Sequence, residues 1–145
     1  MKLVDANILL YAYDSSSVHH AACRTWLENA LNDDEPVGLP WQSTLAFLRI
    51  STSPRAVRKP LAASEACTIV ASLIERPATV IVEPGEHFWS TFREVVDQAR
   101  VTGPLITDAV LAALAIETGA TVCSTDRDFR RFAGLSLIDP TELPR

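Results

Sequence analysis

Short apolar runs alternate with longer amphipathic segments along the chain, and this alternation constrains the fold more than any other feature of the sequence. Residues 79–82 form a largely apolar run of the kind found in strands buried on both faces. Segment 86–100 follows, with apolar residues at helical spacing. Repetition of this order predicts an α/β protein, a three-layer α/β/α sandwich around a parallel sheet of four to five strands.

The element boundaries follow from the same patterns and from the positions of proline and glycine. The expected strands are residues 2–4, 37–39, 79–82, 121–123 and 135–138. The expected helices are residues 8–13, 18–31, 43–50, 63–74, 86–100 and 107–117, with a short one at 127–132. In parallel sheets, functional sites form outside the carboxyl ends of the strands. The residues that follow the strands therefore matter most for function.

Two aspartates follow strands, and a third lies near the start of a helix. Asp5 comes directly after the first strand, and Asp126 comes shortly after strand 121–123. Asp108 shares a helical face with small apolar residues, which would let its helix lie close to the sheet. We therefore expect these three carboxylates to converge at one edge of the sheet.

Each of these acids also has a structural interpretation. Asp108 can simply cap its helix, and Asp126 and Asp128 can be turn residues that lead into the next helix. An acid that ends a buried first strand, such as Asp5, has less structural use. Several carboxylates in one small volume repel one another unless a cation neutralises them. Because oxygen ligands without histidine or cysteine favour Mg²⁺, or alternatively Mn²⁺, the combination predicts a site for one of these ions.

Three segments resemble the PIN-domain family, and within it the VapC-type toxins of VapBC toxin–antitoxin systems. They are Leu3-Val4-Asp5-Ala6-Asn7-Ile8-Leu9, Thr107-Asp108-Ala109-Val110-Leu111-Ala112-Ala113-Leu114-Ala115 and Ser124-Thr125-Asp126-Arg127-Asp128-Phe129. Ala46-Phe47-Leu48-Arg49-Ile50 and Ser53-Pro54-Arg55 look like one branch of these toxins. The resemblance runs essentially from end to end.

This resemblance implies a metal-dependent endoribonuclease of the toxin type, neutralised by a cognate VapB-type antitoxin and forming a homodimer. The residues that match the metal-binding and catalytic acids are Asp5, Asp108 and Asp126, with Asp128 as an additional catalytic acid. Asn7 and Thr125 match supporting polar positions. Many family members have a glutamate where this chain has Phe47, which reduces the expected set of acids.

Contacts with RNA are predicted less directly. Four basic residues fall within eleven positions and can form either a phosphate-facing patch or a solvated loop: Arg49, Arg55, Arg58 and Lys59. Three further arginines flank the acidic motif and could follow the RNA backbone: Arg127, Arg130 and Arg131. The tryptophans lie in amphipathic or apolar runs, so we expect core positions for Trp26, Trp41 and Trp89.

Composition sets the wider limits. A chain of 145 residues with 48% hydrophobic content suits a single domain, residues 1–145, with one sizeable core. No apolar stretch approaches the length of a membrane span. The three cysteines, Cys23, Cys67 and Cys123, are widely spaced in apolar surroundings and predict reduced core residues in a cytoplasmic protein. The net charge of −5 argues mildly against strong nonspecific binding of nucleic acid.

Other functions fit less well. A phosphatase of the haloacid-dehalogenase type needs a second aspartate at the position of Asn7. That class and phosphorelay receivers also need a lysine near a later strand, and neither Lys2 nor Lys59 is so placed. A DNA nuclease of the flap-endonuclease type carries extra DNA-gripping elements, and a chain of 145 residues is short for them. A catalytically weak PIN domain that binds RNA or a partner stays open because of Phe47.

Overall fold

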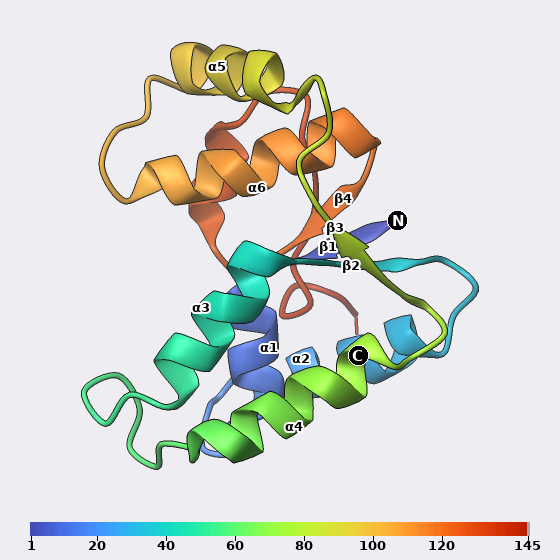
Figure 1. Cartoon of the computed structure of the whole chain (residues 1–145), viewed down its shortest axis with the longest axis vertical. Coiled ribbons are helices and arrows are strands. Elements are labelled where there is room, and N and C mark those ends of the chain that lie inside the picture. Colours follow the sequence, from blue (N-terminus) through green and yellow to red (C-terminus); the bar gives the residue numbers. More distant parts are fainter. Residues whose placement is uncertain (145) are drawn as a thin grey trace.

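A computed structural model describes residues 1–144, and it shows one five-stranded sheet with helices on both faces (Figure 1). The strands are β1 (Lys2–Val4), β2 (Val37–Pro40), β3 (Thr79–Val82), β4 (Thr121–Cys123) and β5 (Ser136–Ile138). The helices are α1 (Ala6–Ala12), α2 (His20–Leu31), α3 (Trp41–Ser51), α4 (Ala63–Ile74), α5 (Phe88–Ala99), α6 (Leu105–Thr118) and the short 3₁₀ helix η1 (Arg127–Arg131). The predicted α/β/α sandwich with a parallel sheet is confirmed.

The strand order is β3-β2-β1-β4-β5, and every neighbouring pair is parallel. The chain builds outward from β1 through β2 to β3, and then returns to the other side of β1 to add β4 and β5. The order therefore reverses between β1 and β4. In open parallel sheets this reversal opens a crevice at the carboxyl ends of the two strands, where ligands bind.

Each face of the sheet has its own apolar core. Helices α5 and α6 cover one face, and α1 to α4 cover the other (Figure 1). Helix α6 is buried along most of its length, which explains why it is the most apolar helix in the sequence. It ends at Gly119, whose φ of 68° is the left-handed conformation that glycine adopts without strain.

Several helices begin earlier than the sequence pattern predicts. Helix α3 starts at Trp41 directly after Pro40, and α6 starts at Leu105 directly after Pro104. Proline suits the start of a helix because its φ is already helical and its missing N–H would have no intrahelical acceptor. The sequence prediction began these helices at residues 43 and 107, two residues late in both cases.

Two predictions about buried residues were wrong. Trp41 and Trp89 are 43% and 65% exposed, whereas Trp26 is half-buried. Cys67 is exposed on α4, while Cys23 and Cys123 are buried as free thiols. An amphipathic helix has a boundary between its two faces, and spacing alone does not say on which side a residue at this boundary lies. Among residues 1–144, no helix is both long and apolar enough to cross a membrane.

Candidate active site

Asp5 and Asp126 lie at the point where the strand order reverses. Asp5 follows β1 and Asp126 follows β4, and the two strands are paired in register, with Val4 opposite Cys123. Both side chains therefore leave the sheet at the same edge. Each carboxylate also accepts a hydrogen bond at the start of a helix: Asp5 from the amide of Ala6 at 2.7 Å, and Asp126 from the amide of Asp128 at 2.8 Å.

Asp108 reaches the same edge from the first turn of α6. Buried small residues, including Ala109 and Ala112, hold this helix close to the sheet. The side chain of Asp108 makes no hydrogen bond or ion pair within residues 1–144, and the N-cap of α6 is Pro104. The side chain of Asp108 therefore does not cap its helix, whereas the side chain of Asp5 caps α1. The sequence allowed a capping role for Asp108 and suggested less structural use for Asp5.

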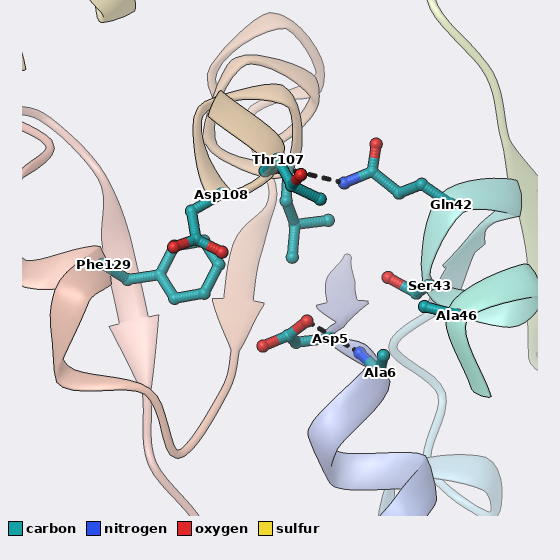
Figure 2. Close-up of a pocket in the computed structure, with 9 residues that line it drawn as sticks. Asp5, Ala6, Gln42, Ser43, Ala46, Thr107, Asp108 and Phe129 are labelled. Atoms are coloured by element: carbon teal, nitrogen blue, oxygen red, sulfur yellow. Dashed lines mark hydrogen bonds between the residues drawn. The ribbon is translucent and has the colours of Figure 1, made fainter. Parts of the chain in front are cut away.

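The carboxylates group differently from the expected trio. One oxygen from each of Asp108, Asp126 and Asp128 lies within 4.8 Å of the others, and Asp5 is outside this cluster. The carboxylate of Asp5 instead lines a small pocket together with Asp108 (Figure 2). The carboxylates of Asp108, Asp126 and Asp128 thus form one cluster, and the carboxylate of Asp5 faces the pocket beside it.

Ser124 connects these acids, and sequence reasoning did not single it out. Its buried hydroxyl donates to Oδ2 of Asp5 at 2.6 Å. The same oxygen accepts from the side-chain amide of Asn7 and from the backbone amide of Asp126, both at 3.0 Å. Position was the available signal, because Ser124 directly follows β4 just as Asp5 follows β1.

The two expected supporting residues have unequal places in this network. Asn7 bonds Ser124 through its amide nitrogen, and its oxygen accepts from the backbone amide of Thr125 at 3.4 Å. The side chain of Thr125 makes no hydrogen bond within residues 1–144. Asn7 therefore ties the end of β1 to the segment after β4, whereas Thr125 contributes through its backbone.

The site holds more negative charge than its surroundings neutralise. Burial, and then the charges of Asp126, Asp5 and Asp128, raise the pKa of Asp108 from 3.8 to about 6. Burial raises the pKa of Asp5 as well, with Asp126 adding to the effect, although the hydrogen bonds from Ser124 and Ala6 oppose it. A divalent cation with oxygen ligands would relieve this repulsion, and no histidine or cysteine belongs to the cluster. The donor set fits Mg²⁺ or Mn²⁺.

The pocket beside the cluster is small, with a volume of about 40 Å³. Asp5 and Asp108 form one side, and Gln42, Ser43 and Ala46 of α3 form the other (Figure 2). Thr107 and Leu111 also line the pocket. A cavity needs roughly 10–15 Å³ of this kind of volume to hold one water molecule, so a few water-sized groups fit here.

Comparison with known proteins identifies the family. The PIN domain family matches residues 2–135. The chain belongs to the PIN-domain family. It is 39% identical to VapC ribonuclease Mb2897 of Mycobacterium bovis over 142 residues, which cover 98% of this chain and 97% of that protein. It is 38% identical to Ribonuclease VapC37 of Mycobacterium tuberculosis, with 99% of each chain covered. The protein is therefore a PIN domain of the VapC group.

Solved structures with low sequence identity share the fold. FitAB bound to the IR36 DNA fragment contains a chain with a TM-score of 0.72 and 17% identity, covering 100% of this chain and 99% of that one. VapBC2 from Rickettsia felis, bound to a promoter DNA fragment, contains a chain with a TM-score of 0.71 and 17% identity, covering 95% of this chain and 97% of that one. At this identity the likeness supports the PIN fold alone.

Phe47 explains how this PIN domain departs from the glutamate pattern. The ring is fully buried, belongs to the core beneath α1 to α4, and packs 5.9 Å from the ring of Tyr13. The pocket is lined instead by Ser43 and Ala46 of the same helix. Position 47 therefore serves packing in this protein, and α3 contributes no carboxylate to the pocket.

The basic residues predicted to contact RNA fall into two groups. Arg49, Arg55, Arg58 and Lys59 are exposed at the end of α3 and in the following loop, and within residues 1–144 they form no ion pair. The arginines beside the acidic motif are paired. Arg127 and Arg130 meet Glu142 at 3.9 and 2.8 Å, and Arg131 meets Asp128 at 3.2 Å. Only the first group has its charge free for a ligand.

Proposed function

We propose that this PIN domain is a metal-dependent endoribonuclease, and that it acts as the toxin of a VapBC-type toxin–antitoxin pair. The single observation that carries the proposal is the cluster of Asp108, Asp126 and Asp128, with Asp5 on the adjoining wall. Relatives that match almost the full chain at 38–39% identity are named VapC ribonucleases, which supports RNA as the substrate.

Each acid has a distinct part in the proposed reaction. Asp108, Asp126 and Asp128 would hold Mg²⁺ or Mn²⁺, with Asp5 as a further acid beside them. A bound ion of this kind neutralises a phosphodiester and lowers the pKa of a water molecule. Asp5 is fixed at both carboxylate oxygens by Ala6 and Ser124, so it gives the pocket a rigid acceptor that can orient a water for attack on phosphorus. Hydrolysis of this type leaves 5′-phosphate and 3′-hydroxyl ends.

The unpaired basic residues supply a route for the RNA backbone. Arg49, Arg55, Arg58 and Lys59 are exposed and lie on the chain segment that leaves α3, the helix that lines one side of the pocket. Phosphate contacts from such residues fix the position of a nucleic acid without reading its sequence. They concentrate positive charge on one segment of a chain whose net charge of −5 by itself disfavours RNA.

The proposed partner is a VapB-type antitoxin, and the toxin itself would form a homodimer. Several solved structures that share this fold are toxin–antitoxin complexes, including VapBC-1 from nontypeable Haemophilus influenzae. Exposed apolar side chains on α3 and α5, such as Leu45 and Trp89, offer surface for such contacts. The proposed activity on cellular RNA places the protein in the cytoplasm.

The test is cleavage of RNA by purified protein with Mg²⁺, with Mn²⁺ and with EDTA. Wild type should cleave RNA only with the metals, and Asp5→Asn should lower cleavage at least about 100-fold, because even outer-shell partners of a metal site are worth 10–100-fold. Asp97→Asn is the matched control, since Asp97 is exposed on α5, away from the pocket. Circular dichroism should show that both variants stay folded.

Three outcomes would contradict the proposal. Cleavage by Asp5→Asn at the wild-type rate would show that the site is elsewhere. RNA binding without metal-dependent cleavage would support a catalytically weak binding domain, and preference for DNA in parallel assays would support a DNA nuclease. Where RNA is cleaved, sequencing of the new 5′ ends identifies the target.

A further inference from the structure

The hydroxyl of Ser43 is buried and has no partner. Ser43 is 3% exposed, its Oγ makes no hydrogen bond, and the residue lines the pocket (Figure 2). Its neighbour Thr44 behaves in the usual way for a helix, donating from its hydroxyl to the carbonyl of Pro40 at 3.1 Å. Buried polar groups are almost always satisfied, so an unpaired hydroxyl beside a functional site indicates a ligand.

The two sides of the pocket differ in chemistry. Asp5 and Asp108 give one side only acceptors. The opposite side is the first turn of α3, where Ser43 offers a hydroxyl and Gln42 an amide that donates weakly, at 3.5 Å, to the carbonyl of Thr107. Helix α3 has 11 residues, and its N-cap, Pro40, makes no side-chain cap bond. The first N–H groups of such a helix lack intrahelical acceptors and favour an anion.

The size of the pocket limits what can bind between these sides. A volume of about 40 Å³ accommodates a few water-sized groups and no nucleotide. A cation next to the carboxylates and one oxygen of an anion next to α3 would fill it. This arrangement places negative charge between a cation and a helix N-terminus, which stabilises it from both directions.

We propose that Ser43, together with the first turn of α3, binds a non-bridging oxygen of the RNA phosphate that is cleaved. This inference rests on the proposed function, because it takes an RNA phosphodiester as the substrate. Ser43 is then a residue that touches the substrate directly. Its hydroxyl would be a neutral hydrogen-bond donor on α3, the same helix in which Phe47 stands where many PIN domains have a glutamate.

The test measures binding of inorganic phosphate to the intact protein in the presence of Mg²⁺. Binding is detected as shifts of the ¹⁵N–¹H resonances of the first turn of α3. Ser43→Ala should weaken phosphate binding about tenfold, the usual value of one hydrogen bond to a charged group. The affinity for Mg²⁺ alone should stay within about twofold, since Ser43 faces the anion in this arrangement.

The chain offers a matched control on the same helix. Ser51 is also buried with an unpaired hydroxyl, but it lies at the far end of α3 and does not line the pocket. Ser51→Ala should leave phosphate binding unchanged. Because neither hydroxyl has a partner, neither substitution should lower the unfolding midpoint.

Several results would overturn the inference. The first is that the wild-type protein binds no phosphate, and the second is that the Ser43→Ala protein binds phosphate normally. The third is an equal loss of Mg²⁺ and phosphate binding in Ser43→Ala, because this would assign the hydroxyl to the cation or to a water bound to it. A lower unfolding midpoint in Ser43→Ala alone would assign it to the fold. Phosphate binding through Ser43 without RNA cleavage would leave this inference standing and refute the proposed function. RNA cleavage together with phosphate binding that does not depend on Ser43 would support the proposed function and refute this inference.

Discussion

Helices α3 and α6 begin at the same pocket and begin in the same way, yet they contribute opposite chemistry. Each follows a proline that makes no side-chain cap bond, and Gln42 of α3 reaches the carbonyl of Thr107 in α6. Helix α6 places the carboxylate of Asp108 in its first turn, whereas α3 places the hydroxyl of Ser43 there. One helix start suits a cation ligand, and the other suits an anion.

The comparison also shows which electrostatic effect prevails at Asp108. A helix N-terminus stabilises a carboxylate, typically by about 0.3–1 kcal/mol, and should lower its pKa. The pKa of Asp108 nevertheless rises to about 6, because burial and three neighbouring aspartates outweigh the helix. A favourable helix start is therefore insufficient to hold the pKa of Asp108 at its ordinary value of 3.8.

The strongest challenge to the comparison is to make α3 acidic with Phe47→Glu. If position 47 reached the pocket, the variant would bind Mn²⁺ more tightly. Because Phe47 is fully buried against Tyr13, we expect loss of packing and an unpaired buried charge to destabilise the fold by at least about 4 kcal/mol. Urea denaturation followed by circular dichroism measures this.

The control for that substitution is Leu45→Glu, which adds the same charge to the same helix at a residue that is 56% exposed. Surface substitutions of this kind usually change stability by no more than about 0.5 kcal/mol. A folded Phe47→Glu protein with increased Mn²⁺ affinity would show that α3 can turn this position toward the acids.

Removing the acid from α6 tests the other half of the comparison. Asp108→Asn should reduce RNA cleavage at least about 100-fold, as expected for loss of a metal ligand. Without metal at neutral pH, the same variant should be more stable by about 1 kcal/mol, or roughly 2–4 °C in unfolding midpoint, because it relieves repulsion among the carboxylates. Asp97→Asn should change neither quantity.

The stability gain should depend on pH in a defined direction. The pKa of Asp108 in the folded protein, about 6, lies above its ordinary value of 3.8. The bound proton therefore stabilises the metal-free fold fully below 3.8, and this contribution is lost as pH rises through 6. The advantage of Asp108→Asn should be present at pH 7.5 and disappear near pH 3.5. An equal advantage at both values would mean that repulsion is not its cause.

The smallest expected effect is the pH dependence of metal binding by wild type. A carboxylate must lose its proton to bind a cation, so Mn²⁺ affinity should fall by up to about tenfold for each pH unit below the pKa of Asp108, about 6. Electron paramagnetic resonance of free Mn²⁺ measures this affinity. Constant affinity between pH 5 and pH 7 would show that Asp108 is already ionised or is not a ligand.

The sequence predicted those features that depend on the order of elements. Apolar runs and helical spacing gave every strand and helix, and the rule on strand ends brought Asp5 and Asp126 to one edge of the sheet. Features that depend on side-chain direction were not predictable in this way. Whether Asp128 or Asp5 joins the cluster is decided by rotamers and by hydrogen bonds to Ala6 and Ser124.

Other differences have the same origin. Trp41 and Trp89 have the spacing of core residues, but they lie at the borders of helix faces and remain exposed. Ser43 and Ser124 have no sequence signal of their own, because serine is common in turns and helix starts. Their importance follows from what surrounds them: the hydroxyl of Ser43 is buried without a hydrogen-bond partner, whereas the hydroxyl of Ser124 bonds to three polar atoms.

The contacts of Ser124 determine where its single hydrogen atom must be. Two N–H groups, from Asn7 and Asp126, point at its oxygen, so the hydroxyl hydrogen is committed to Asp5. Asp5 then accepts at both of its oxygens, one from Ser124 and one from Ala6. A proton added to either oxygen would weaken one of these bonds, even though burial favours the neutral acid. The network thus favours neutralisation of Asp5 by a neighbouring positive charge over its own protonation.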